Sequence, residues 1–151
     1  MPTFNPVDPD FERHIRASFA RQKLLESLGA RLTAVSPGAV EIELPFRADL
    51  TQQHGFVHAG ILTSIVDTAC GYAALTLMPA GFEVLTVEFK VNFVSPATGA
   101  RFIGRGRVTK PGRTLTVCAG DVFATSGGAE QLVATMLATM MGLPERASPP
   151  E

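Results

Sequence analysis

The sequence predicts a single α+β domain in which one long helix is buried against an antiparallel sheet. The segment 58–78 is mostly apolar on all sides and contains no proline, which is typical of a helix in a protein core. Beyond it, apolar and polar residues alternate in runs separated by tight turns. Such runs predict consecutive antiparallel strands, and the buried helix needs that sheet to wrap it.

The composition fits one globular domain. The chain has 151 residues, of which 46% are hydrophobic and 18% are charged, so it can bury a core and is not disordered over its bulk. The formal net charge is -1, and no basic excess indicates a nucleic acid or an anionic membrane as a partner. We expect neither a signal peptide nor a span across a membrane.

Two cysteines, Cys70 and Cys118, bear on location and metal binding. They lack the spacing of a zinc site or of a disulfide framework. We expect each to be a small buried hydrophobe in a reducing compartment. The cysteines therefore favour a cytoplasmic location and give no indication of a zinc site, and we expect no cofactor.

The predicted domain occupies residues 10–143. Residues 1–9 hold three prolines and few apolar groups, so we expect a flexible N-terminal arm. Residues 144–151 are expected to form a flexible C-terminal tail. No internal repeat or second domain is evident between them.

Two patterns precede the buried helix. Apolar residues recur near helical spacing through residues 10–28, which predicts one amphipathic helix with Asp10 as its cap and Gly29 as its stop. Two extended runs, 31–36 and 39–46, are joined by a Pro-Gly pair. They predict a β-hairpin.

The strands follow the buried helix. Segment 84–94 alternates and predicts a long half-buried strand, with an apolar face of Leu85, Val87, Phe89, Val91 and Phe93 and a polar face of Thr86, Glu88, Lys90 and Asn92. Residues 100–109 and 113–124 predict two more strands around a Lys-Pro-Gly-Arg turn. A turn at 126–128 follows, and the run 131–141 is as helical as it is extended by propensity.

Asp67 is the residue of the buried helix that most needs an explanation, because an ionised carboxylate in an apolar helix is costly unless it is paired or functional. It belongs to one stripe of small and polar residues, namely Gly60, Ser64, Asp67, Gly71 and Ala74. This face could open to a ligand or to another chain. The alternative is a carboxylate satisfied by Ser64 or by a neighbouring strand, and the pattern leaves both open.

The start of the same helix is the second feature. Residues 58–60, His-Ala-Gly, would present unpaired N–H groups that can hold a developing oxyanion; an ordinary helix start is the alternative. Gly60 and Asp67 are roughly 10 Å apart along a helix axis, too far for one Asp67 to serve a carbonyl at its own helix start. Two antiparallel helices across a two-fold axis would solve this, so we expect a homodimer or homotetramer with shared sites.

These residues resemble a known family. The stretch QQHGFVHAGILTSIVDTACGYAA closely resembles the signature of the phenylacetic-acid-degradation (PaaI-like) type of hot-dog thioesterase, approximately N-x-x-G-x-x-H-G-G with a D further along the same helix. The strand LTVEFKVNFVSPATG resembles the family's strand that ends in a Ser-Pro turn. The resemblance covers residues 28–142. It implies a hot-dog fold, a dimer or a tetramer of dimers, and hydrolysis of acyl-CoA thioesters without a metal.

The resemblance also implies roles for single residues. Asp67 corresponds to the catalytic acid, as general base or nucleophile, and His58 to the residue that positions the thioester. The N–H of Ala59 corresponds to the oxyanion donor, Gln52 stands where Asn is frequent, and Thr86 corresponds to the residue that orients water. Ala59 replaces a glycine and keeps the N–H while adding a methyl group. Gln52 keeps the amide and lengthens its reach.

Further residues are candidates for substrate binding. Gly60 and Ser64 are expected to line the substrate on the helix face. Basic side chains around one turn could hold the phosphates of CoA, namely Arg105, Arg107, Lys110 and Arg113. A charged, solvated strand edge is the alternative. His54 is interpreted as a surface residue.

The sequence leaves three functions to be compared. An acyl-CoA thioesterase accounts for the helix start and Asp67 together. A non-catalytic module that binds acyl-CoA or lipid is the main alternative. A hot-dog dehydratase is disfavoured because the sequence lacks a matching pair of His and acid.

Overall fold

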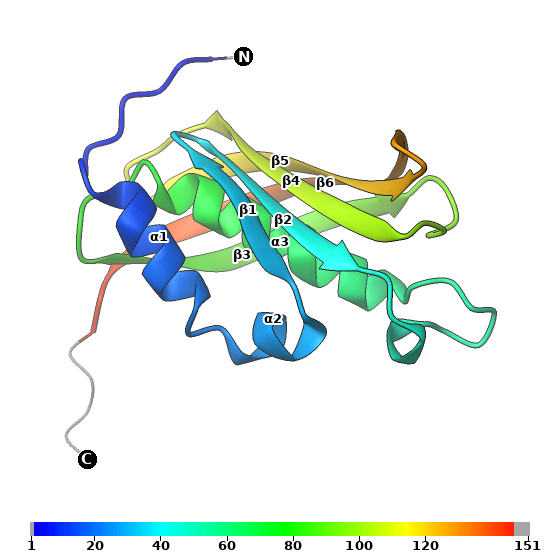
Figure 1. Ribbon diagram of the computed structural model, residues 1–151. Coiled ribbons are helices and arrows are strands. Elements are labelled where there is room, and N and C mark those ends of the chain that lie inside the picture. Colours follow the sequence, from blue (N-terminus) through cyan, green and yellow to red (C-terminus); the bar gives the residue numbers. More distant parts are fainter. Residues whose placement is uncertain (1, 147–151) are drawn as a thin grey trace.

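A curved six-stranded antiparallel sheet wraps one central helix (Figure 1). The computed structural model describes residues 2–146, so Met1 of the predicted arm and residues 147–151 of the predicted tail lie outside them. In chain order the elements are α1 (Phe11–Phe19), α2 (Lys23–Leu28), β1 (Arg31–Ser36), β2 (Ala39–Pro45), the 3-10 helix η1 (Ala48–Leu50), α3 (Ala59–Leu75), β3 (Phe82–Phe93), β4 (Arg101–Lys110), β5 (Leu115–Ser126) and β6 (Ala129–Pro144). The predicted α+β fold class is confirmed.

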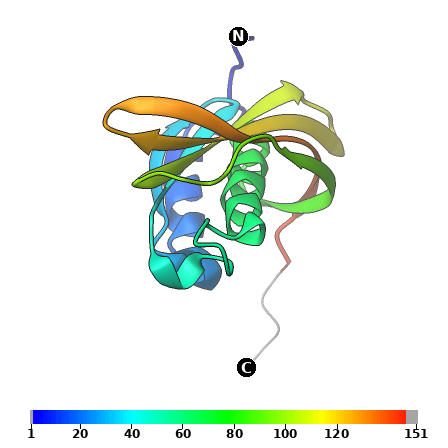
Figure 2. The same cartoon turned by 90° about the vertical axis from the view of Figure 1, so that its right-hand side faces the viewer.

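The strands follow the order β1-β2-β4-β5-β6-β3, and every neighbouring pair is antiparallel. Figure 2 shows the sheet arching over α3, with α1 beside that helix. The run 131–141, ambiguous by propensity, is part of β6. It lies between β5 and β3 and pairs on both edges, so tertiary pairing overrides the local preference.

The core lies between α3 and the concave face of the sheet. Ile65, Val66 and Ala69 are fully buried there. Glycines in the sheet let the helix approach closely, since a Cβ built on Gly106 would lie 2.3 Å from the carbonyl carbon of Ala69. The buried helix and the wrapping sheet are thus confirmed, although α3 ends at Leu75 and not at the residue before the proline.

The single helix predicted over residues 10–28 is wrong, because the chain forms α1 and α2 with a break at residues 20–22. Ile15, Leu25 and Leu28 are all buried. In one straight helix, at about 100° per residue, Leu28 would point roughly 140° away from Ile15. The break lets both side chains reach the core, and a left-handed residue at position 29 ends α2 as expected.

The facing of β3 also differs from the prediction. The register with β6 shifts between Thr86 and Glu88, so Val87 is an extra residue in a β-bulge and the alternation reverses there. Thr86 pairs with the fully buried Met140 and faces the helix. Leu85, predicted on the core face, lies on the outer face instead.

The predicted half-burial of β3 is wrong for the single chain. Among residues 2–146, the strand is at one edge of the sheet and pairs only with β6. Most of its side chains are exposed, including Leu85, Val87, Phe89 and Phe93. Its free edge therefore presents a long apolar row to solvent.

Other expectations concern the termini and membranes. Asp10 holds the N-cap position of α1 without a side-chain cap and pairs with Arg13 at 3.2 Å. Within the predicted arm, Phe4 packs against the core and Asp8 is buried. The domain boundaries remain a prediction. In the part of the chain that the structure describes, no helix is long and apolar enough to cross a membrane.

Candidate active site

Asp67 and Thr86 meet at the centre of the site. Asp67 projects from the middle of α3, and the Oγ1 hydroxyl of Thr86 donates a hydrogen bond of 2.8 Å to its Oδ1 atom. The bulge in β3 turns Thr86 toward the helix and makes this contact possible. Asp67 is therefore satisfied by a neighbouring strand, and the hydroxyl of Ser64 instead donates to the carbonyl of Gly60 at 2.8 Å.

The environment of Asp67 disfavours its charge. Burial raises the pKa of Asp67 above its usual value, and the hydrogen bond from Thr86 lowers it by a smaller amount. No basic side chain is among the residues that line the surrounding cavity. A half-buried carboxylate without a cationic partner is typical of a functional acid or base.

That cavity has a volume of about 220 Å³. Its walls come from α3, from β3 and β6, and from the link between α1 and α2. The lining residues are Gln22, Asp67, Thr68, Gly71, Tyr72, Val84, Leu85, Thr86 and Met140. The carboxylate thus faces a small space lined by both polar and apolar side chains.

His58 caps the start of α3. This residue is the N-cap of α3, and its Nδ1 atom accepts a hydrogen bond of 2.9 Å from the N–H of Gly60. A neutral His58 therefore carries its proton on Nε2, which leaves an exposed donor. The N–H of Ala59 is exposed and has no acceptor within residues 2–146. Two donors at the positive end of the helix dipole are free to bind an anionic oxygen.

The loop before α3 uses its own polar groups. The Oε1 atom of Gln52 accepts a hydrogen bond from the N–H of His54, and Thr51 bridges to Val57. The imidazole of His54 is exposed. Gln52 thereby shapes the turn that leads into the helix start.

The structure brings Asp67 and Thr86 together and leaves the helix start apart from them. His58, Ala59 and Gln52 do not line the cavity at Asp67, nor do Gly60 and Ser64. One chain therefore contains two half-sites that lie at different levels of α3.

The arginines of β4 lie on the other face of the sheet. Gly104 and Gly106 face α3, so Arg105 and Arg107 point to the outer face. Arg105 pairs with Glu41 at 2.9 Å and with Glu130 at 2.8 Å. Arg107 pairs with an aspartate at 2.7 Å. Both arginines are neutralised by carboxylates, and neither lines the Asp67 cavity.

The other two basic residues flank the turn between β4 and β5. Lys110 and Arg113 are exposed, and neither forms an ion pair within the described part of the chain. Of the four predicted basic residues, these two keep an unneutralised charge.

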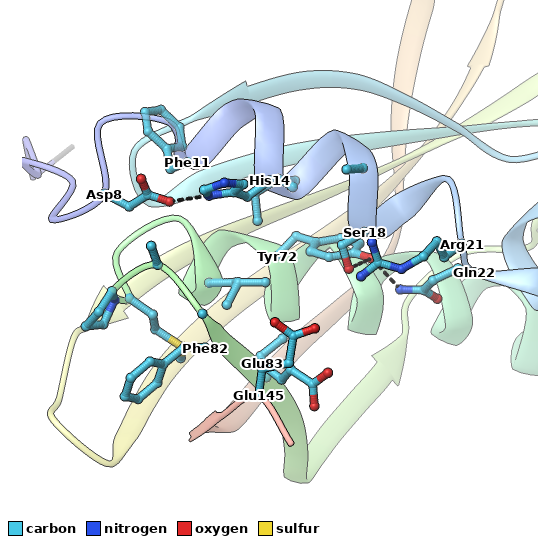
Figure 3. Close-up of a pocket in the computed structure, with 18 residues that line it drawn as sticks. Asp8, Phe11, His14, Ser18, Arg21, Gln22, Tyr72, Phe82, Glu83 and Glu145 are labelled. Atoms are coloured by element: carbon cyan, nitrogen blue, oxygen red, sulfur yellow. Dashed lines mark hydrogen bonds and ion pairs between the residues drawn. The ribbon is translucent and has the colours of Figure 1, made fainter. Parts of the chain in front are cut away.

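Two residues of the site were missed in the sequence. Tyr72 does not belong to the stripe of small and polar residues on the helix, yet it lines the cavity, and its hydroxyl accepts a hydrogen bond of 2.9 Å from Nε2 of Gln22 (Figure 3). Gln22 reaches the cavity because the α1–α2 link turns it inward. The one available signal was that Tyr72 is the single tyrosine of the chain and lies near Asp67.

Comparison with known proteins identifies the family. A model of the thioesterase superfamily matches residues 54–130, which include the helix start, Asp67 and Thr86. The chain belongs to the thioesterase superfamily. It is a thioester hydrolase with the hot-dog fold.

Solved structures and curated relatives agree with this assignment. A thioesterase family protein from Silicibacter pomeroyi is 52% identical, with a TM-score of 0.87, over 89% of this thioesterase and 98% of that chain. The PaaI protein of Escherichia coli, from the phenylacetic acid degradation operon, shares the fold with a TM-score of 0.79 at 16% identity, over 90% and 95% of the two chains. Human acyl-coenzyme A thioesterase 13 is 25% identical over 77% of this chain and 84% of its own length.

Proposed function

We propose that this thioesterase hydrolyses acyl-CoA to a free acid and CoA, and that Asp67 acts on the thioester carbonyl. One observation carries the proposal: a carboxylate with a raised pKa, held by Thr86, faces a small cavity that no basic side chain of the described residues lines. The name of the human relative, an acyl-coenzyme A thioesterase, supports CoA as the thiol.

Two routes are open to Asp67. As a general base, it takes a proton from water while the water oxygen attacks the carbonyl carbon, and a raised pKa makes it a better base near neutral pH. As a nucleophile, it forms a mixed anhydride that water then opens. In both routes the carbonyl oxygen becomes negative, the C–S bond breaks, and the thiolate of CoA leaves and is protonated.

The helix start supplies the oxyanion site in this proposal. The N–H of Ala59 is free to donate to the carbonyl oxygen, and His58 presents Nε2 beside it. Such donors stabilise the charge that develops in the transition state. The hydrogen bond from Thr86 orients the Asp67 carboxylate toward the attacked carbon.

The proposed site is completed by a second copy. Within one chain the helix start and Asp67 are separate half-sites, and β3 leaves a long apolar edge unpaired. An exposed edge of this kind favours strand pairing with another chain. A two-fold axis at β3 would place Asp67 of each protomer near Ala59 of the other, as a homodimer or within a homotetramer.

The phosphates of CoA need cations outside the Asp67 cavity. Lys110 and Arg113 remain candidates because their charges are unpaired in the described residues. Arg105 would have to leave two carboxylates first. We expect charge reversal at Lys110 to raise KM for acyl-CoA more than reversal at Arg105.

A thiol-release assay tests the function. Wild type and Asp67→Ala would be compared on benzoyl-CoA, phenylacetyl-CoA and straight-chain acyl-CoAs of increasing length. The proposal requires thiol release by wild type and its loss in the variant. Unchanged turnover in Asp67→Ala would exclude Asp67 from the chemistry, and tight binding without any thiol release would support the non-catalytic module instead. Single turnover in oxygen-labelled water separates base from nucleophile.

A further inference from the structure

A second and larger cavity adjoins the one at Asp67. Its volume is about 390 Å³, and it lies between α1, the end of α3 and the start of β3 (Figure 3). Gln22, Tyr72 and Val84 line both cavities. These three side chains therefore form the boundary between the two spaces.

The larger cavity is lined by apolar and polar residues in similar measure. The apolar residues come mainly from α1, from α3 and the link that follows it, and from β3, namely Phe11, Ile15, Leu75, Met78, Phe82 and Val84. His14 of α1, Arg21 of the α1–α2 link and Glu83 of β3 also line the cavity. An alkyl chain that continues from the Asp67 cavity could contact the apolar residues.

One contact closes the boundary. Nε2 of Gln22 donates to the hydroxyl of Tyr72 at 2.9 Å, and the hydroxyl of Ser18 lies 3.1 Å from the same oxygen. Tyr72 is 3% exposed and fixed on α3. Gln22 is half-buried in the α1–α2 link, and this is its side chain's one hydrogen bond within residues 2–146. Gln22 is thus the movable member of the pair.

We propose that Gln22 is a specificity-determining residue that limits the length of the acyl group. Held by Tyr72, its side chain blocks the passage from the Asp67 cavity into the cavity beneath α1. Acyl groups that fit the smaller cavity bind without disturbing this contact, whereas longer ones must displace Gln22. The inference rests on the proposed function, since it assigns the acyl group to the Asp67 cavity.

The size of the effect follows from the contact that must break. Displacing one hydrogen bond of ordinary net strength corresponds to about a two- to thirteenfold preference. Gln22→Ala should therefore raise the ratio of long-chain to short-chain kcat/KM by about that factor. Tyr72→Phe keeps the ring and removes the acceptor, so it should shift the ratio in the same direction.

The test uses two readouts on the full-length protein. The first is kcat/KM for straight-chain acyl-CoAs from butyryl to palmitoyl. The second is calorimetric affinity for non-hydrolysable thioether analogues of the same lengths, which does not depend on turnover. Lys23→Ala is the matched control, because Lys23 directly follows Gln22 in the chain and its side chain is exposed and lines neither cavity.

Each outcome decides a separate point. A shift of the preference toward longer acyl chains in both the Gln22 and the Tyr72 variants, absent in Lys23→Ala, supports the proposed role of Gln22. The same length profile in wild type and Gln22→Ala overturns it, whether or not thiol is released. Binding of the analogues without hydrolysis of any acyl-CoA would overturn the proposed function alone. The dependence of affinity on chain length would still test whether Gln22 limits the acyl group. Absence of binding at every length would overturn both.

Discussion

The Thr86 hydroxyl lies 2.8 Å from the Asp67 carboxylate, and this contact joins an edge strand to the central helix. It depends on the β-bulge at Val87. Without the extra residue, Thr86 could not share the helix-facing side with Phe89 and Val91 further along the strand. A local irregularity of the backbone thus positions the single hydrogen-bond donor to the proposed catalytic carboxylate that the structure shows.

Asp67→Asn should lower the activity and raise the stability of the protein. We expect kcat to fall by about 10²- to 10⁴-fold, the usual contribution of a general base. The folded-state pKa of Asp67 is raised by burial, so the unfolded chain releases this proton first as the pH rises, and folding loses stability up to the folded pKa. The variant lacks that penalty and should have the higher Tm at neutral pH.

Thermal unfolding of wild type and Asp67→Asn across a range of pH tests the direction of this stability difference. The difference in Tm should shrink as the pH falls toward about 4 and vanish well below it, where the carboxyl is protonated in both states. A variant that is less stable than wild type at neutral pH would contradict the raised pKa.

Thr86→Val should move the pH profile. The hydroxyl of Thr86 lowers the pKa of Asp67, so its removal lets burial raise that pKa further. Because the ionised carboxylate is the active form, the acidic limb of kcat/KM should shift to higher pH, with a greater loss at pH 6 than at pH 8. Thr86→Ser keeps the donor and should retain the wild-type limb; equal limbs in all three proteins would rule out this role.

Ala59→Pro should remove the oxyanion donor and leave the fold intact. Position 59 is the first residue of α3, where proline is well tolerated, and His58 already has the extended conformation that suits a residue before proline, with φ -60° and ψ 137°. We expect kcat to fall about 10²- to 10³-fold with little change in Tm. Ala59→Gly keeps the N–H and serves as the control, and full activity in the proline variant would exclude this donor.

Mixing two inactive variants should restore activity if sites are shared. In a heterodimer of Asp67→Asn and Ala59→Pro, one site contains both substitutions and the other contains neither. Random exchange of subunits should therefore recover about one quarter of wild-type activity. Complete absence of recovery, after exchange is verified by mass spectrometry, would show that each site belongs to one chain.

Phe89→Glu should disrupt the proposed dimer. Phe89 is 42% exposed in the single chain and lies on the free edge strand, so a buried charge there would oppose pairing. We expect a monomer without activity, measured by sedimentation velocity and assay on the same sample. Leu24→Glu, at an exposed site of α2, is the control. A fully active monomer would refute the shared site.

The local pattern of apolar and polar residues was sufficient to predict much of the fold. The hairpin at residues 31–45, the buried helix and the turns are confirmed, because each depends on residues close in sequence. The run 131–141 could not be assigned, since its conformation depends on pairing with β5 and β3. The helix break at residues 20–22 was missed because it serves the burial of distant side chains.

The α+β class, the helix that carries Asp67 and the helix start at His58 could be predicted from the amino-acid pattern alone, since helical period and capping are local properties. The same pattern shows that the helix start and Asp67 are separated along the helix axis. The three-dimensional packing was needed to show that Thr86 faces Asp67, that Arg105 lies on the opposite face of the sheet, and that Gln22 contacts Tyr72. These contacts follow from one bulge that reverses the facing of a strand and one break that redirects a helix. Both are selected by packing between segments far apart in the chain, which a local pattern does not contain.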